Sequence, residues 1–385
     1  MKKFSKALIL SLMVGSVITG IVSCERSDDE PPVTKGKIGR LYISFSNYRD
    51  GATPFPTIGI IDNADSVLAN GGDMSTIFKL RNISITSGVK GGATLYFDPF
   101  VQRIYQAPKN ENGLSDTVLR HMSYNLNGIP ASTNSIQNSV MGSVRGMAIN
   151  IPENNNEPRF LYVTKTSRTG VNMDLQPVGI YKFNSAIANG YVRYGQKITL
   201  AGLGEERAPW GLAINGKTLY ASISGPNGGV MVLPNVVNNL DTLLADYSNT
   251  QMHTIAGASK VRGISYHLLK DILVLTDYTG QGPSAVGKIY IIENFSKLPA
   301  GEITPTRTIQ GASTGLIEPV DVSIDKRANG TFMFVVDKSS RYISRFKITD
   351  NGNVAPDARL KVDKTPETGI NVEMIPEGIY FDGRD

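Results

Sequence analysis

The sequence predicts an all-β fold built from repeated units of short strands. Its 385 residues include 39 glycines and 20 prolines, and only 19% are charged, which suits a turn-rich β protein. The clearest unit lies in residues 303–338, where strands are expected at Thr306–Gln310, Val320–Ile324 and Phe332–Val336. Apolar and polar residues alternate in these runs, and Gly, Pro, Asn and Asp separate them, which predicts β-hairpins.

A five-residue segment similar to the middle strand of this unit recurs along the chain, and we call each copy an anchor strand. The anchor strands are Thr94–Asp98, Gly146–Asn150, Gly211–Asn215, Gly263–His267, Asp321–Asp325 and Gly378–Asp382. They begin 52, 65, 52, 58 and 57 residues apart, a period typical of propeller blades or solenoid units. After the third anchor strand, further strands are expected at Leu219–Ser222, Gly229–Leu233 and Met252–Ala256. Four short strands per repeat indicate a propeller blade.

The two ends of the chain favour a closed ring over a rod. Arg40–Ser44 is expected to be a second strand without an anchor strand before it, and Thr57–Ile61 and Thr76–Leu80 supply the third and fourth strands. Gly378–Asp382 is an anchor strand with nothing after it. Joined, the ends complete one blade, and this closure leaves no exposed sheet edge. The predicted fold is a six-bladed β-propeller of four-stranded blades over residues 38–385, with its terminal strands sharing one blade.

Two recurring residue types are expected to be structural. Asp or Asn ends five of the anchor strands, and such side chains cap turns by accepting hydrogen bonds from nearby backbone. Glycine starts four of them, and it permits close packing of strands near a crowded axis.

The repeats resemble a known group of propellers. Pro305–Gly311, Pro319–Asp325 and Leu161–Thr164 are similar to repeats of NHL/YVTN-type six-bladed propellers, also called TolB-like. The resemblance covers residues 38–385 and implies the fold. It implies no single function, because propellers host many unrelated activities.

The N-terminus predicts export and a lipid anchor. Three lysines in the first six residues and the apolar run Ala7–Val22 are typical of a secretory signal, here residues 1–23. Cys24 follows at the position where a bacterial lipobox is acylated, and acyl chains anchor proteins in bilayers. The acidic run Glu25–Glu30 resembles the surface-export tether of some Gram-negative lipoproteins, so residues 24–37 are expected to form a flexible tether. We therefore expect an outer-membrane lipoprotein on the cell surface. The alternatives are a plain signal peptide with an incidental cysteine, and a tether that is only a solvated linker.

Charge and cysteine content exclude some classes. The formal net charge is +5, but without the three leader lysines 36 basic residues face 34 acidic ones. Nucleic-acid binding needs a clustered basic face, so no nucleic-acid partner is expected. Cys24 is the only cysteine, which rules out a disulfide within the chain. We expect a monomer that contacts the membrane through its anchor only.

The candidate binding residues come from two sets of positions. In propellers of the resembled type, the residue before each anchor strand lies at the mouth of the axial channel. These residues are Ala93, Arg145, Trp210, Arg262, Val320 and Glu377. The ends of the second strands are expected to reach the same face, with Asn47, Tyr48, Arg49, Lys165, Arg168, Asp277, Tyr278, Asp337, Lys338 and Arg341.

These residue types indicate a ligand site rather than a catalytic one. A tryptophan face stacks on a sugar or a cation, and arginine binds carboxylates and phosphates through two hydrogen bonds. We expect Arg145, Trp210, Arg262, Glu377, Asp277, Asp337 and Tyr278 to bind a glycan, a peptide or a partner protein, without catalytic residues or a cofactor. In the alternative arrangement, Trp210 plugs the channel while Arg145 and Arg262 pair with Glu377 or with carbonyls.

Two other functions remain open. Pro376–Asp382 resembles the first metal-ligand segment of the gluconolactonase family, which implies a divalent cation such as calcium on Glu377 and a lactonase-like hydrolase. That family also needs an asparagine at the mouth, and none of the six mouth positions carries one. The third possibility is an inert structural protein of the envelope.

Overall fold

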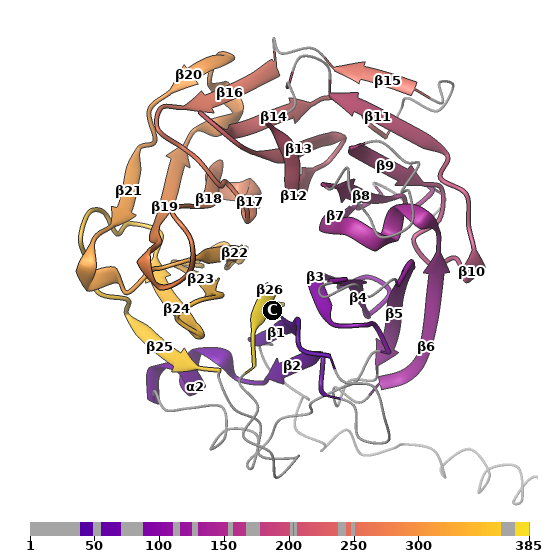
Figure 1. The fold of residues 1–385 in the computed structure, drawn as a ribbon, viewed down its shortest axis with the longest axis horizontal. Helices are drawn as coiled ribbons and strands as arrows, with labels where there is room; N and C mark the ends of the chain where they lie inside the picture. Colours follow the sequence, from indigo (N-terminus) through magenta and orange to yellow (C-terminus); the bar gives the residue numbers. More distant parts are fainter. Residues whose placement is uncertain are drawn as a thin grey trace, which may run out of the picture. The chain divides into compact units, whose positions relative to one another are not determined.

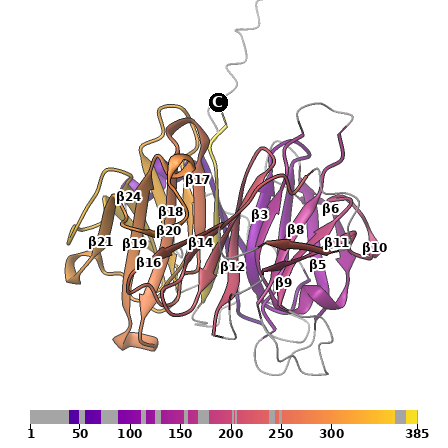
Figure 2. The ribbon, with the colours of Figure 1, turned by 90° about the horizontal axis from the view of Figure 1, so that it is seen from above.

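The protein forms a ring of six β-sheets, seen down its axis in Figure 1 and turned by 90° in Figure 2. The computed structural model describes residues 39–48, 55–70, 88–110, 116–124, 130–152, 157–166, 178–200, 203, 206–237, 244–247, 251–362 and 374–384. All of these belong to one compact unit, residues 38–384. The predicted six-bladed β-propeller is confirmed. The predicted signal peptide, Cys24, the tether and the strand Thr76–Leu80 lie outside the described residues.

The blades follow one another around the ring, and the strands of each blade run in order from the axis outward. Blade I contains β26 (Pro376–Asp382), β1 (Arg40–Phe45) and β2 (Ile58–Ile61). Blade II contains β3 (Gly92–Asp98), β4 (Arg103–Pro108), β5 (Val118–Tyr124) and β6 (Pro130–Gln137). Blade III contains β7 (Val144–Ile149), β8 (Leu161–Lys165), β9 (Gly179–Phe183) and β11 (Gln196–Leu200).

The second half of the ring repeats this order. Blade IV contains β12 (Ala208–Asn215), β13 (Thr218–Ser224), β14 (Gly229–Leu233) and β16 (Met252–Ile255). Blade V contains β17 (Ile264–His267), β18 (Ile272–Thr279), β19 (Val286–Glu293) and β21 (Arg307–Gln310). Blade VI contains β22 (Pro319–Ile324), β23 (Phe332–Asp337), β24 (Tyr342–Lys347) and β25 (Ala358–Lys361).

The ring closes where the two ends of the chain pair. β26 runs antiparallel to β1, with Arg40 opposite Asp382 and Ser44 opposite Gly378. This pairing confirms the blade shared by the terminal strands. Because β26 is the innermost strand of blade I, the last strand of the chain faces the axis.

Neighbouring blades are also joined at the outer edge of the ring, which the sequence did not predict. Three short strands make these joins: β10 (Gly190–Tyr191), β15 (Leu244–Tyr247) and β20 (Gly301–Ile303). In the sequence, each comes after the third strand of its blade and before the fourth. Each pairs in parallel with the fourth strand of the preceding blade, namely β6, β11 and β16. In blade I, helix α2 (Ala64–Asn70) takes this place and lies beside β25 (Figure 1).

Short 3₁₀ turns complete the connections. They are η1 (Ser139–Ser143), η3 (Leu268–Lys270), η4 (Gly282–Ser284), η5 (Phe295–Lys297) and η6 (Ala312–Thr314). Within the described part of the chain, no helix has the length and apolar character needed to cross a membrane.

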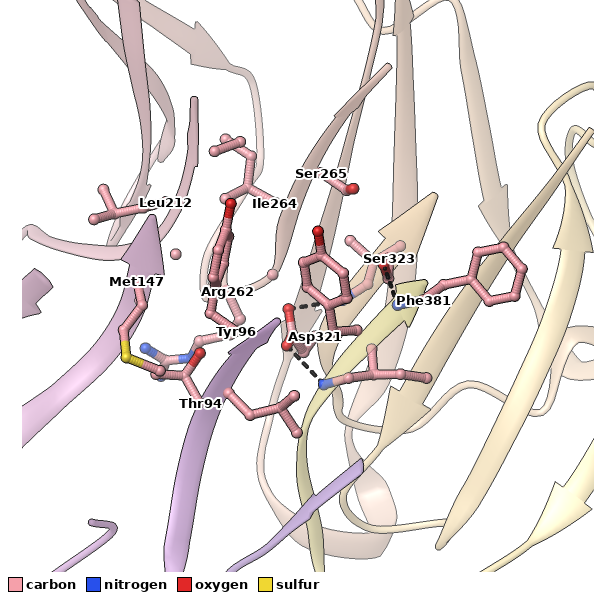
Figure 3. Close-up of a pocket in the computed structure, with 18 of the residues that line it drawn as sticks. Thr94, Tyr96, Met147, Leu212, Arg262, Ile264, Ser265, Asp321, Ser323 and Phe381 are labelled. Atoms are coloured by element: carbon pink, nitrogen blue, oxygen red, sulfur yellow. Dashed lines mark hydrogen bonds between the residues drawn. The ribbon is translucent and has the colours of Figure 1, made fainter. Parts of the chain in front are cut away.

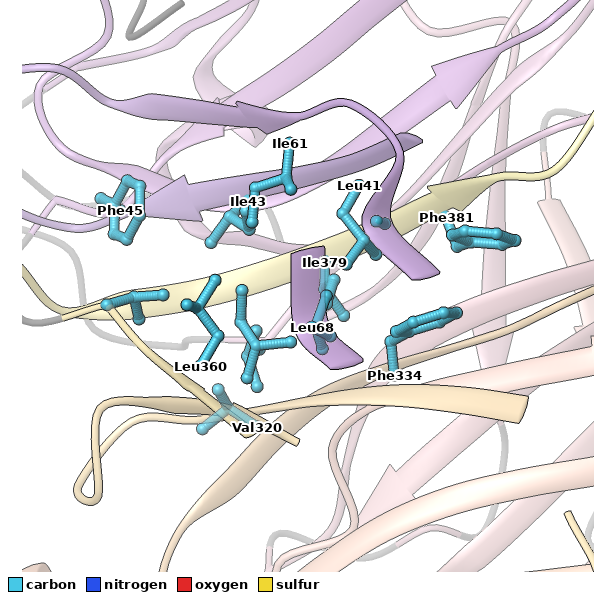
Figure 4. Packing of buried hydrophobic residues seen from close by; sticks show 14 of the residues in the cluster. Leu41, Ile43, Phe45, Ile61, Leu68, Val320, Phe334, Leu360, Ile379 and Phe381 are labelled. Atoms are coloured by element: carbon cyan, nitrogen blue, oxygen red, sulfur yellow. The ribbon is translucent and has the colours of Figure 1, made fainter. Parts of the chain in front are cut away.

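The hydrophobic core lies between the blades, because both faces of each sheet are covered. Alternate residues of a strand point to opposite faces. Leu41 and Ile43 of β1 therefore pack with Phe334 of blade VI, whereas Tyr42 between them packs with Phe97 of blade II (Figure 4 shows the first of these clusters). Burial of each such side chain contributes about 1.5–3 kcal/mol.

The two structural expectations for the anchor strands are confirmed. A β-carbon at Gly146 would lie 2.3 Å from the carbonyl oxygen of Trp210 in the next blade, so only glycine allows this approach. At the other end of the anchor strand, Asp98 Oδ1 accepts the amide of Phe100 at 3.0 Å, and Asn150 Oδ1 accepts that of Phe160 at 2.6 Å.

Candidate functional site

An axial cavity of about 370 Å³ is lined by the inner strands of all six blades (Figure 3). The six residues before the anchor strands all line it, namely Ala93, Arg145, Trp210, Arg262, Val320 and Glu377. Their side chains gather because each occupies the same position at the start of an inner strand. We call this end of the cavity the mouth.

Glu377 is the centre of an ion triad at the mouth. Its Oε2 lies 2.7 Å from Lys109 Nζ and its Oε1 lies 3.0 Å from Lys338 Nζ, and the glutamate side chain is only 6% exposed. Lys109 follows β4 in blade II and Lys338 follows β23 in blade VI, so the carboxylate on β26 is bound from both neighbouring blades. Burial alone would raise the pKa of Glu377, but the two lysine charges outweigh it and hold this pKa below its ordinary value.

Arg262 stacks on the only tryptophan of the protein. Its guanidinium carbon lies 3.3 Å from the centre of the Trp210 ring and 5.8 Å from that of Tyr278. Burial lowers the pKa of Arg262, although a guanidinium with so high an ordinary pKa remains protonated near neutral pH. One face of Trp210 is therefore covered by an arginine of the next blade.

Arg145 is oriented by backbone carbonyls. Its guanidinium donates to the carbonyl oxygens of Val144 and Lys109, both at 2.9 Å. The alternative arrangement is therefore correct for Arg145, which binds carbonyls. The ion-pair partners of Glu377 within the described part of the chain are the two lysines.

Of the ten predicted residues at the ends of second strands, Tyr278 and Lys338 line the cavity, and Arg49 and Arg168 lie outside the described residues. The carboxylates of Asp277 and Asp337 are 0% and 1% exposed, respectively, and are turned into the blades. Asp277 accepts the backbone amide of Lys260 at 2.6 Å, and Asp337 accepts that of Ile317 at 2.6 Å. These two aspartates therefore fix the segments that lead into the inner strands of blades V and VI, and burial raises the pKa of both.

Sequence reasoning missed two residues of the site. The first is Lys109, which follows the end of β4 at Pro108 and takes the position that Tyr278 and Lys338 hold in their blades. A comparison of the second strands in the observed register would have found it.

The second missed residue is Asp321, which stands where four other anchor strands have glycine. Its Oδ1 accepts the amide of Val322 and its Oδ2 accepts the amide of Ile379 in β26, both at 2.9 Å. Burial raises the pKa of the Asp321 carboxyl to about 7. An aspartate that interrupts a glycine pattern was the signal in the sequence.

The mouth is electropositive. Among the described residues that line it, the cationic side chains of Lys109, Arg145, Arg262 and Lys338 outnumber the carboxylates of Glu377 and Asp321. The donor set does not fit a divalent cation, because ammonium groups contact both oxygens of the Glu377 carboxylate. Elsewhere in the described ranges, no three His, Cys, Asp or Glu side chains form a group that could hold a metal ion. The arrangement suits an anion.

Fold and site together define a six-bladed β-propeller with a cationic and aromatic axial pocket. No protein-family model and no curated protein sequence matches the chain. Similar solved structures include a putative 6-phosphogluconolactonase from Bacteroides uniformis, with 13% identity over 90% of this chain and 99% of that one at a TM-score of 0.48. A functionally unknown protein from Desulfotomaculum acetoxidans has 14% identity over 91% of this chain and 90% of that one, at a TM-score of 0.48. The calcium structure of a Trichoderma reesei protein of Carbohydrate-Active Enzymes Family AA12 has 10% identity over 78% of this chain and 92% of that one, at 0.49. Likeness at this level carries no argument about function.

Proposed function

We propose that this protein is a non-catalytic binding protein that holds an anionic ligand at the mouth of its axial channel. One observation carries the proposal: among the residues described there, four cationic side chains and two aromatic rings line the mouth, against the two carboxylates of Glu377 and Asp321. Acidic groups of a glycan, a peptide or a partner protein have the chemistry that such a mouth recognises.

The physical properties of the pocket support this role. Arginine and lysine form strong charge-assisted hydrogen bonds with carboxylates and phosphates, and these bonds strengthen where water is excluded. The cavity volume of about 370 Å³ lies within the range of small-molecule sites, about 300–1,000 Å³. Because Arg262 covers one face of Trp210, a ring of the ligand would stack on the other face or on Tyr278.

A direct test is calorimetric titration with an oligosaccharide of uronic acids and with its neutral methyl ester. We expect the acid to bind, with a Kd that rises with salt, and the ester to bind at least tenfold more weakly. Arg262→Ala and Lys338→Ala should each weaken binding of the acid about tenfold. Lys297→Ala, at an exposed lysine of η5, is the control. The proposal is overturned for glycans if the acid and the ester bind with the same Kd, or if both mouth variants bind the acid as tightly as the wild-type protein. A short acidic peptide is then titrated in the same way.

We also propose that the protein is a lipoprotein on the outer surface of the outer membrane. Support comes from the leader in residues 1–23, from Cys24 and from the acidic run that follows. Cells grown with labelled palmitate should yield a labelled wild-type protein and an unlabelled Cys24→Ser variant. Protease added to intact cells should degrade the wild-type protein, and protection from it would place the protein inside the outer membrane.

No observation favours the calcium-dependent hydrolase built on Glu377. The carboxylate that would bind the cation already lies between two ammonium groups, and both oxygens of the Asp321 carboxylate accept backbone amides. Binding of the cation would require both lysines to move away.

A further inference from the structure

We infer that the ligand is an amphipathic anion, with its charged group at the mouth and an apolar tail that enters the channel. This inference rests on the proposed function and narrows it to a class of ligand. It depends on what lies directly beneath the mouth.

A ring of apolar side chains lies two residues further along each inner strand, and we call it the collar. It consists of Leu95, Met147, Leu212, Ile264, Val322 and Ile379, and all six line the same cavity as the mouth residues. Figure 3 shows Met147, Leu212 and Ile264, which come from three successive blades, around this space. Two residues of a strand span about 7 Å, so the backbone of the collar lies roughly that far along the inner strands from the backbone of the mouth residues.

Polar side chains at the depth of the collar already serve to join the blades. Ser265 Oγ accepts the amide of Ile324 at 3.1 Å, and Ser323 Oγ accepts the amide of Phe381 at 2.9 Å. Both carboxylate oxygens of Asp321 accept backbone amides as well. These groups are therefore occupied. The hydroxyl groups of Thr94, Tyr96 and Tyr380 also line the cavity, and the collar adds apolar surface beside them.

The orientation of the ligand follows from the charges at the two ends of the cavity. At the far end, the cavity is lined by Lys326 and Arg384, and Arg384 forms an ion pair with Asp382 at 2.8 Å. Lys326 lies 5.7 Å from the ring of Tyr380. The mouth thus has four cationic groups with Glu377 between two of them, and the far end has two cationic groups with Asp382 paired to one. The larger excess of positive charge at the mouth directs the charged group of a monoanion there.

The test is a series of linear carboxylates from acetate to octanoate, titrated against the full chain in detergent. Each methylene that enters the collar should tighten Kd about fourfold, which corresponds to about 0.8 kcal/mol. Octanamide, which has no charge, should bind at least tenfold more weakly than octanoate. A comparison of the Kd values of octyl phosphate and octanoate shows which headgroup the mouth binds more tightly.

Two negative outcomes are distinguishable. If acetate and octanoate bind with the same Kd, the collar is not used and this inference fails, while the proposed function stands. If neither carboxylate nor phosphate binds in any length, the proposed function itself fails.

A variant of the collar gives a second, independent measurement. Met147→Gln has a similar length but presents an amide to the tail, so octanoate should bind about tenfold more weakly while acetate is unchanged. Leu269→Gln, at a residue of η3 that is 69% exposed, is the matched control. Unchanged octanoate binding by a folded Met147→Gln protein would contradict the inference. If this variant does not fold, the carboxylate series on the wild-type protein alone tests whether the tail enters the collar.

Discussion

Lys109 and Glu377 are 268 residues apart in the sequence, and their side chains meet at 2.7 Å at the mouth of the channel. The contact joins blade II to β26, the strand that closes the ring. Lys338 contacts the same carboxylate from blade VI. One glutamate therefore ties the last strand of the chain to both of its neighbours, in addition to the backbone pairing of β26 with β1.

Glu377→Gln should destabilise the protein by roughly 3 kcal/mol, because it leaves two lysines near each other with no carboxylate between them. The lowered pKa of Glu377 predicts that its stabilisation is present at neutral pH and is lost as pH falls through that pKa. Urea unfolding at pH 7 and pH 4 measures both effects. Glu302→Gln, on the exposed strand β20, is the control, and equal stability of the two variants at pH 7 would show that the triad contributes nothing.

Asp321 should affect the pH dependence of stability in the direction opposite to Glu377, and Asp321→Asn should remove this effect. The pKa of Asp321 is raised from 3.8 to about 7, so the folded state holds a proton that the unfolded state releases between these values. As pH rises from about 4 to 7, the free energy of unfolding of the wild-type protein should therefore fall relative to that of Asp321→Asn, by up to about 1.4 kcal/mol per pH unit. Melting curves at half-unit intervals measure this difference, and a constant difference across the range would contradict the raised pKa.

Arg262→Lys should alter the fluorescence of Trp210, the single tryptophan. Lysine keeps the charge but lacks the planar group that stacks 3.3 Å from the ring, so water should reach the indole and shift its emission to longer wavelength. The lost cation–π contact should cost about 0.5–2 kcal/mol. Arg207→Lys, whose arginine donates to Pro226, is the control. Identical emission spectra for wild type and Arg262→Lys would contradict the stacked arrangement.

Removal of residues 376–385 should lower the melting temperature sharply. It deletes β26, which leaves an inner edge of β1 unpaired and removes Glu377 from between the two lysines. A chain that ends at Gly383 keeps all of β26 and is the control. Thermal unfolding followed by circular dichroism compares the two, and an unchanged melting temperature after the longer deletion would refute closure by the terminal strands.

Much of the fold was predictable because it depends on local patterns. The spacing of the anchor strands gave the number of blades, and the incomplete units at the two ends indicated ring closure. The parallel strands β10, β15 and β20 were not predictable, since they are two to four residues long and pair with another blade. Their positions depend on how neighbouring sheets meet, which alternation along one strand does not report.

The sequence by itself determined where the anchor strands begin, and its resemblance to NHL/YVTN-type propellers implied that Arg145, Trp210, Arg262 and Glu377, which precede them, would gather at one end of the channel. Only the tertiary structure decided how they pair. Arg262 covers Trp210 because successive inner strands approach closely at glycines. Glu377 contacts two lysines because Lys109 and Lys338 come from second strands on either side of β26. Such contacts depend on the register between blades, and residues from different blades carry no local sequence signal of it.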